Sequence, residues 1–244
     1  MPVGDVFPPK IINLNPSFSP LMTPGEEAGS FSCELIGWEE AADLSRTLAY
    51  KIRNSGYCPD IVIAIGRGGY VPARIVCDYM LHEKLTSIRI EHWGIAAEKK
   101  DKATVVFPLS TDISGLSVLV IDDVTDTGET LEAAVDYISS LDPAEIRTGV
   151  LHHKDCSFYE PDFYAKYVEK WRWIVYPWAL YEETFGFSEK VLSGEYATPG
   201  EIQKKLHEIY GFDVDTGMLR DALADLAASG RAARSGVCFK SAGK

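Results

Sequence analysis

One stretch of fourteen residues, VLVIDDVTDTGETL (Val118 to Leu131), constrains the fold of this 244-residue chain more than any other. Its first four residues are apolar and mostly β-branched, which favours a parallel strand buried on both faces. Asp122 and Asp123 follow directly, and then come hydroxyl-bearing residues around a glycine. Residues 131–141 resume with the apolar spacing of a helix. The stretch therefore predicts a strand, a short loop and the start of a helix.

A loop that opens a helix is suited to bind an anion, because backbone N–H groups and the positive end of the helix dipole converge there. Gly128 lets the backbone approach closely, and the threonine hydroxyls add donors. The two preceding carboxylates suit sugar hydroxyls and a hard divalent metal such as Mg²⁺. These features predict a phosphorylated sugar as ligand, and the alternative is an ordinary loop with an N-cap aspartate. The residue order of a nucleotide-binding P-loop is missing, so ATP hydrolysis is not favoured.

A second glycine-rich loop, Gly66-Arg67-Gly68-Gly69, follows the apolar run Ile61 to Ile65. Three glycines let backbone N–H groups turn toward an anion, and one guanidinium can clamp it. A plain tight turn is the alternative. Residues 71–80 are then expected to form a helix, with Pro72 in its first turn.

Together the two loops resemble the phosphoribosyl pyrophosphate (PRPP) signature of type I phosphoribosyltransferases. The resemblance implies an α/β fold with a central parallel sheet, flanking helices and a flexible hood loop. It also implies that Asp122 and Asp123 face the ribose hydroxyls and Mg²⁺. The family often carries a non-proline cis peptide in the second loop, and if present here it should involve Gly66-Arg67 or a neighbour. The residues assigned to PRPP by this resemblance are Gly66, Arg67, Gly68, Gly69, Asp122, Asp123, Thr125, Asp126, Thr127, Gly128, Glu129 and Thr130.

The resemblance also places a base site. Asp126 would manage the proton of the base, and Lys154, after a strand expected at 144–151, would donate to the 6-oxo group of a purine. Trp171 to Tyr181 resembles the W-I-x-x-P-W segment of bacterial xanthine-guanine enzymes, which aligns Trp173 with the stacking residue and the backbone of Ile174 with the base edge.

Two positions in this segment depart from those enzymes. Val175 and Ala179 stand where they carry acids, and the acid replaced by Val175 recognises the group at purine position 2. The change weakens guanine and xanthine relative to hypoxanthine. Trp171 and Trp178 are expected to serve in packing.

Residues 92–108 are expected to form the hood loop, with Lys99, Lys100 and Lys102 as plausible pyrophosphate contacts. The alternatives are a β-hairpin with a solvated tip and an exposed loop of no function. His152 and His153 are adjacent, so in a strand they point to opposite faces, which argues against a shared metal site.

A net charge of −12 argues against broad nucleic-acid or anionic-membrane binding. The five cysteines show no CxxC pair, which favours reduced thiols and a cytoplasmic protein. No apolar run approaches the roughly 20 residues of a membrane helix.

Three regions are predicted. Residues 1–30 are rich in proline and favour extended or disordered chain, residues 31–192 form the phosphoribosyltransferase domain, and residues 193–244 form a small winged-helix-like module. The module has a capping box at Thr198, an N-cap at Asp215 or Thr216, and a hairpin near Ser235-Gly236. From Lys190 onward there are eight basic and seven acidic residues, a weak footprint for DNA, although the module keeps nucleic-acid binding open.

We therefore predict a purine salvage enzyme that transfers the phosphoribosyl group of PRPP, with Mg²⁺, to hypoxanthine, xanthine or guanine. A homodimer or higher homo-oligomer is expected from the resemblance. One alternative keeps the chemistry with orotate or adenine as the base. The other is a PRPP-sensing transcriptional regulator without catalysis.

Overall fold

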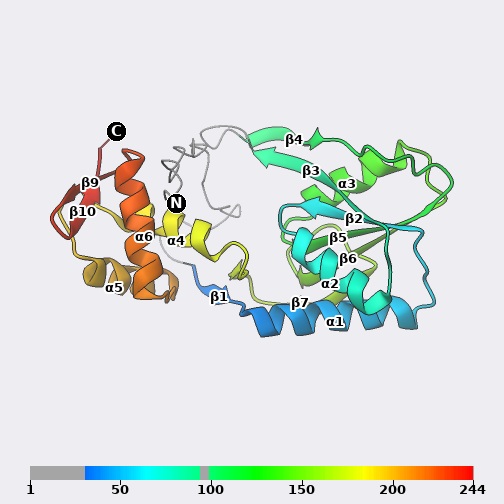
Figure 1. Ribbon diagram of the computed structural model, residues 1–244, viewed down its shortest axis with the longest axis horizontal. Helices are drawn as coiled ribbons and strands as arrows, with labels where there is room; N and C mark the ends of the chain where they lie inside the picture. Colours follow the sequence, from blue (N-terminus) through cyan, green and yellow to red (C-terminus); the bar gives the residue numbers. More distant parts are fainter. Residues whose placement is uncertain (1–30, 94–98, 244) are drawn as a thin grey trace, which may run out of the picture.

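The central sheet has six strands in the spatial order β4-β3-β2-β5-β6-β7 in the computed structural model, which describes residues 31–93 and 99–243 (Figure 1). All neighbouring strands are parallel except β3 and β4, which are antiparallel. The strands are β2 (Ile61–Gly66), β3 (Leu85–Trp93), β4 (Lys99–Phe107), β5 (Ser117–Thr125), β6 (Glu145–Lys154) and β7 (Phe163–Val168).

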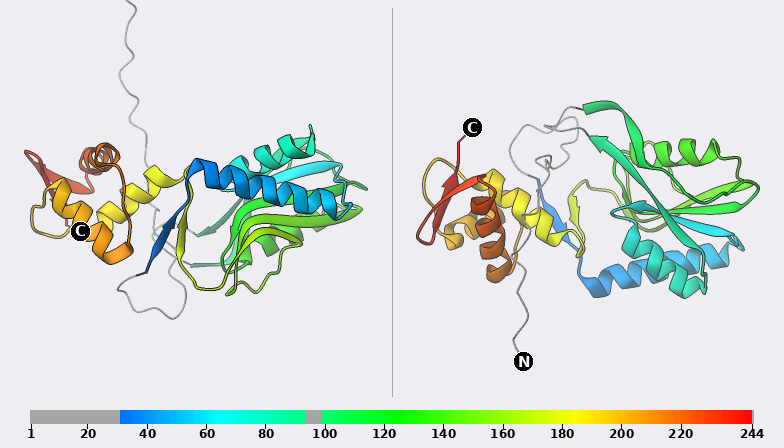
Figure 2. Two further views of the ribbon diagram at one scale, coloured as in Figure 1. Left: turned by 90° about the horizontal axis from the view of Figure 1, so that it is seen from below. Right: turned by 45° about the horizontal axis from the view of Figure 1, so that its top comes forward.

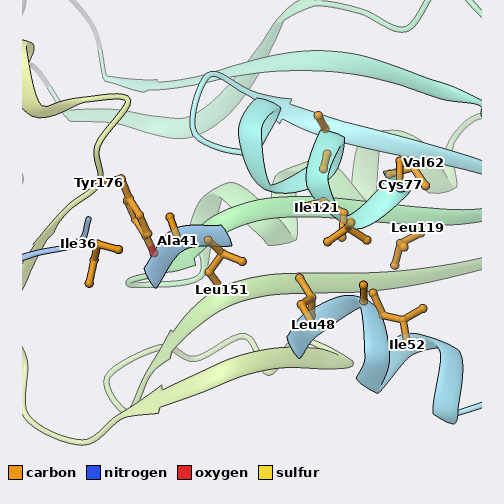
Figure 3. Packing of buried hydrophobic residues seen from close by; sticks show 14 of the residues in the cluster. Ile36, Ala41, Leu48, Ile52, Val62, Cys77, Leu119, Ile121, Leu151 and Tyr176 are labelled. Atoms are coloured by element: carbon orange, nitrogen blue, oxygen red, sulfur yellow. The ribbon is translucent and has the colours of Figure 1, made fainter. Parts of the chain in front are cut away.

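Helices cover both faces of this sheet. Helices α1 (Trp38–Asn54) and α2 (Tyr70–Met80) lie on one face, and α3 (Glu129–Ser139) lies on the other. Alternate residues of a strand point to opposite faces, so Ile121 of β5 packs with α1 and α2 while Val120 packs with α3. Figure 3 shows the first of these cores, with Leu48 of α1 facing the strands. The predicted α/β class with a mostly parallel sheet is confirmed.

The strand order reverses between β2 and β5. From β2 the chain crosses to β3 on one side, and from β5 it crosses to β6 on the other. A crevice forms outside the carboxyl ends of strands at such a reversal, and ligands bind there in open α/β sheets. Both glycine-rich loops follow these two strands, so the topology brings them to this one place.

The remaining elements form a smaller part beside the sheet, seen at the left of Figure 1. Two short strands, β1 (Cys33–Leu35) and β8 (Trp173–Val175), pair in parallel. The chain then continues through α4 (Leu180–Val191), α5 (Pro199–Tyr210), α6 (Thr216–Ala228) and the antiparallel hairpin of β9 (Ala232–Ser235) and β10 (Cys238–Ser241). Figure 2 shows from two further sides that α4 lies between the sheet and this hairpin.

The helices of the smaller part begin as predicted. Thr198 and Glu201 form the capping box of α5, and the Asp215 side chain accepts from the first N–H groups of α6. Phe187, Leu206 and Leu223 are fully buried in a core of their own. Two helices and a hairpin follow α4, while the comparison with a winged helix stays a prediction, as do the three domain boundaries.

Other expectations fall partly outside the structure. Residues 1–30 and the tip of the predicted hood, residues 94–98, lie outside the described residues. The flanking segments form the antiparallel pair β3 and β4, the hairpin alternative for this region. None of the helices within the described ranges is long and apolar enough to cross a membrane.

Candidate active site

The two glycine-rich loops meet at the ends of β2 and β5. A Cβ atom on Gly68 would collide with the carboxylate of Asp123, and one on Gly69 would collide with the carbonyl oxygen of Ile121. Larger residues do not fit there, because the loop after β2 lies directly on the end of β5. The Gly66-Arg67 peptide bond is cis, as predicted. The structure thus brings the two predicted phosphate loops together.

Strand β5 is longer than the sequence predicted. It was expected to end at Ile121, but it continues through Asp122 and Asp123 to Thr125. Pairing with β6 persists because the ladder uses backbone groups and does not depend on the side chains. Successive side chains of a strand alternate, so the two carboxylates leave opposite faces of the sheet. Asp123 is the one that lies against the Gly68 loop.

Both carboxylates lie in surroundings that disfavour charge. Asp122 is only 8% exposed. Burial raises the pKa of both groups above the usual aspartate range, and the charge of Asp123 raises the pKa of Asp122 further. A bound divalent cation would offset this cost, since an opposite charge favours the ionised form. The donor set therefore fits Mg²⁺.

The protein alone would supply few ligands to that cation. In the described ranges, no three His, Cys, Asp or Glu residues cluster in a way that could hold a metal. Mg²⁺ commonly takes one or two carboxylates and completes its shell with water and substrate phosphates. Two aspartates beside two phosphate loops match that pattern.

The loop after β5 has the features of an anion site. Gly128 has a φ of 99°, and a Cβ there would lie 2.7 Å from Tyr159 Cβ. Helix α3 begins at Glu129 without a side-chain N-cap, so no side chain of its N-cap residue competes with a bound anion. Thr127 and Thr130 border this helix end. Thr125, unlike Thr127 and Thr130, is buried: it is 2% exposed, and its hydroxyl lies 3.3 Å from His153 Nδ1.

Asp126 and Lys154 form an ion pair beside this loop. Lys154 Nζ donates to Asp126 Oδ2 at 2.8 Å, although the two residues are 28 positions apart. They meet because β5 and β6 are parallel neighbours and both residues lie at the carboxyl ends. Lys154 is 2% exposed, and a lysine is rarely buried so deeply without a partner. The sequence predicted both residues for the site.

Aromatic side chains surround this ion pair. The Lys154 Nζ atom lies 4.8 Å from the ring centroid of Trp171 and 5.9 Å from that of Trp173. Trp171 also donates its indole N–H to Asp126 Oδ1 at 3.0 Å. Trp171 was expected only to pack, so its contact with the acid is a finding of the structure. Trp173 lies next to Lys154, as the predicted base site requires.

The two residues that follow Trp173 bury their side chains in hydrophobic cores. Ile174 belongs to the core with α1, and Val175 to the core of the smaller part. The role of the Ile174 backbone at the base edge stays a prediction. Val175 is 1% exposed, so its side chain does not take up the position-2 role of the acid that it replaces.

Sequence reasoning missed an aromatic network that holds Asp123. Trp178 donates its indole N–H to Asp123 Oδ2 at 3.3 Å, and Tyr176 donates its hydroxyl to the Asp123 carbonyl at 2.8 Å. The two rings are stacked, with centroids 4.8 Å apart and 6° between their planes. Trp178 was expected only to pack. The alternation of aromatics at 176 and 178 is the one sequence signal that could have suggested a shared face.

His152 supports this network from β6. Its Nδ1 atom lies 2.7 Å from the Tyr176 hydroxyl, which already donates to Asp123, so Nδ1 carries the proton and donates. Burial lowers the pKa of His152 to about 4, and the ring is therefore neutral at pH 7. His153 points to the other face, toward Tyr164. The predicted opposite orientation of the two histidines is confirmed.

Arg67 has an anionic partner that the sequence did not indicate. Its guanidinium lies 2.6 Å from Glu182 of α4, and both side chains are partly exposed. A pyrophosphate at this loop would compete with Glu182 for the guanidinium. Lys99, Lys100 and Lys102 belong to β4, and the positions of their side chains lie outside the described part of the chain.

Three comparisons agree on the family of proteins that this chain resembles. The model of the phosphoribosyl transferase domain matches residues 34–183. A xanthine-guanine phosphoribosyltransferase from Ruegeria is 29% identical over 155 residues, covering 59% of this chain and 84% of the relative. A hypoxanthine-guanine phosphoribosyltransferase from Saccharomyces cerevisiae is 28% identical over 130 residues, covering 46% and 57%. Among solved structures, a purine phosphoribosyltransferase from Pyrococcus horikoshii has a TM-score of 0.53 and 29% identity, covering 60% of this chain and 93% of that one.

Proposed function

From the premise that this chain belongs to the phosphoribosyltransferase family, we propose that it transfers the 5-phosphoribosyl group of PRPP to a 6-oxopurine base. The products are a purine nucleoside monophosphate and pyrophosphate, as purine salvage requires. The base is hypoxanthine, xanthine or guanine, the bases that appear in the names of the relatives.

The observation that carries this proposal is the buried pair of Lys154 and Asp126, 2.8 Å apart, beside two phosphate loops. The pair offers one donor and one acceptor next to an aromatic face, Trp173. A 6-oxopurine is complementary to it, because its oxo group accepts from Lys154 and a ring N–H donates to Asp126. Adenine would place an amino donor against the ammonium group, and orotate lacks the fused ring that a broad aromatic face favours.

PRPP extends from the base site across the end of the sheet. The 5-phosphate lies at residues 125–130 and the N-terminus of α3, where N–H groups and the helix dipole favour an anion. The pyrophosphate lies at Gly66 to Gly69, and the ribose hydroxyls face Asp122 and Asp123. Strands β5 and β2 are neighbours in the sheet, so the two loops lie side by side at the same edge.

The reaction breaks the bond between the ribosyl carbon and pyrophosphate and forms a bond from that carbon to a ring nitrogen. Positive charge develops on the ribose as pyrophosphate leaves, while Arg67 and the loop N–H groups stabilise the departing anion. Asp126 accepts the proton that the base nitrogen loses, a role typically worth about 10²–10⁴ in rate. Lys154 keeps the 6-oxo group in place and so orients the attacking nitrogen.

Mg²⁺ would be held by Asp123 and substrate oxygens, while Asp122, whose side chain leaves the other face of the sheet, would add negative charge nearby. When bound, it supplies positive charge that neutralises the diphosphate. The proposal includes a cytoplasmic location, which the five free thiols support. It also includes a homodimer, which light scattering of the purified protein would test.

The test of the proposal is pyrophosphate release with PRPP and Mg²⁺, one base at a time: hypoxanthine, xanthine, guanine, adenine and orotate. Turnover with one or more of the first three, and at least 100-fold lower kcat/KM with adenine and orotate, supports it. A protein that binds PRPP by calorimetry but turns over none of the five bases would overturn it. Turnover with adenine or orotate alone would keep the chemistry and reject the base assignment.

A further inference from the structure

Trp171 makes contacts in the active site that resemble those of a ligand more than those of a packing residue. Its indole N–H donates to Asp126 Oδ1 at 3.0 Å, and Lys154 Nζ lies 4.8 Å from the centre of its ring. These are the two side chains to which the proposed function assigns the base. Trp171 therefore contacts both of them at once.

The chemistry of the indole explains why it satisfies both contacts. An indole is a five-membered ring fused to a six-membered ring and carries its N–H on the smaller ring, as the imidazole part of a purine can. Asp126 accepts from that N–H, and the ammonium group of Lys154 is attracted to the electron-rich face of the ring. A 6-oxopurine would offer the same kind of N–H to Asp126 and a stronger partner, its oxo group, to Lys154.

Little of Asp126 is left for a second ligand while Trp171 is in place. Lys154 takes one carboxylate oxygen and Trp171 takes the other, and the thiol of Cys156 also lies 3.6 Å from the second oxygen. The Asp126 side chain is only 17% exposed. Oδ1 thus already accepts from two donors, so a base N–H that approaches this oxygen competes with the indole.

The chain around Trp171 permits such a displacement. Trp171 lies in the irregular segment between β7, which ends at Val168, and β8, which begins at Trp173. Its ring contacts the edge of Phe31 with centroids 5.8 Å apart, and it is not fully buried. Trp173, by contrast, is fixed by the pairing of β8 with β1.

We propose that Trp171 is a specificity-determining residue that occupies the hydrogen-bonding groups of the base site until a 6-oxopurine displaces it. This inference rests on the proposed function. A base gains entry only if its contacts with Asp126 and Lys154 together outweigh those of the indole. Bases with a ring N–H and an oxo group meet that condition, and a purine without the oxo group does not.

The displacement has a cost that can be measured. If the docked indole is favoured by about ten to one, the affinity for a base or a nucleotide product is reduced about tenfold relative to an open site. Trp171→Phe keeps an aromatic ring in the segment but removes the N–H, so it should shift this equilibrium toward the open site. Trp171→Leu removes the ring as well and provides a second variant.

The experiment compares wild type, Trp171→Phe, Trp171→Leu and a control, Trp38→Phe. Trp38 is 60% exposed on α1 and contacts Trp178 rather than Asp126, so its replacement removes an indole without opening the base site. Isothermal calorimetry measures the Kd of inosine 5′-monophosphate and of PRPP with Mg²⁺. Steady-state assays give KM for hypoxanthine and for unsubstituted purine, and thermal melting confirms that each variant is folded.

We expect both Trp171 variants to bind inosine 5′-monophosphate about tenfold more tightly and to lower KM for hypoxanthine by a similar factor. The Kd of PRPP should change less than twofold. Relative kcat/KM for unsubstituted purine should rise, because the threshold set by the indole is gone. Trp38→Phe should behave as wild type.

Unchanged or weaker nucleotide binding by folded Trp171 variants, with wild-type turnover intact, would overturn the inference and leave the proposed function standing. Such a result would make Trp171 a residue that positions Asp126. A wild-type protein that neither binds inosine 5′-monophosphate nor turns over any 6-oxopurine would overturn both.

Discussion

Glu183 of α4 should add its own loss of stability between acidic and neutral pH to that of the buried pair Asp122 and Asp123. Burial raises the pKa of Glu183 from 4.5 to about 7, and the charge of neighbouring Glu182 adds to the shift. The folded state therefore holds this proton more tightly than the unfolded chain. The resulting stability is fully present below about pH 4.5 and is lost as the pH rises through about 7.

The size of the effect follows from the two pKa values. For one group with a pKa of about 7 in the folded state and 4.5 in the unfolded state, the stability lost between pH 5 and pH 8 is about 2.5 kcal/mol. Glu183→Gln removes the titration and should remove this loss. With a urea m value of roughly 2–3 kcal/mol/M, the difference corresponds to a shift in the midpoint of about 1 M.

Urea unfolding followed by circular dichroism at pH 5 and pH 8 would measure this difference for wild type and Glu183→Gln. Glu195→Gln is the matched control, because Glu195 is an exposed glutamate near the start of α5. The control should keep the pH dependence of wild type. If Glu183→Gln also kept it within about 0.5 kcal/mol, Glu183 would be hydrated in the folded state and the reasoning from burial would be wrong.

Three further predictions concern the site itself. Gly68→Ala should weaken PRPP binding at least tenfold in calorimetry, because a Cβ there collides with the Asp123 carboxylate. Gly200→Ala, at an open position of α5, is the control and should leave PRPP binding unchanged. Equal Kd values in the two variants would contradict the proposed loop contact. Trp178→Phe keeps the stacked ring but loses the bond to Asp123, so KM for PRPP should rise about fivefold at constant fold stability, whereas an unchanged KM would assign Trp178 to packing alone. Asp126→Asn should lower kcat by about 10²–10⁴ with PRPP binding intact, and near-wild-type turnover would rule out its role as proton acceptor.

The fold of the larger part could be predicted because its signals are local. Helix α1 is an example, because Leu48 and Ile52 are buried and four residues apart, a spacing that is visible in the sequence itself. The apolar run before Asp122 predicted β5, but the predicted strand ended too early. The two aspartates interrupt the apolar pattern, while the backbone pairing with β6 continues to Thr125. Backbone pairing extends a strand past charged residues when the neighbouring strand continues.

The candidate site was predicted where it depends on the ends of strands. Asp126 lies just after strand β5, and Lys154 is the last residue of strand β6. Because these strands are parallel neighbours, their carboxyl ends meet at one edge of the sheet and bring the two side chains together. Glu182 and Trp178 were not predicted for the site, because their contacts depend on how β8 and α4 are placed against β2 and β5. No local spacing in the sequence encodes that placement.

Phe31, the first described residue, contacts both tryptophans of the base site and two aromatic residues of the smaller part, Phe187 and Tyr210. The wall behind the proposed base pocket is therefore made jointly by the two parts of the chain. Grafting these helices onto a relative would accordingly require exchanging β1 and β8 along with them.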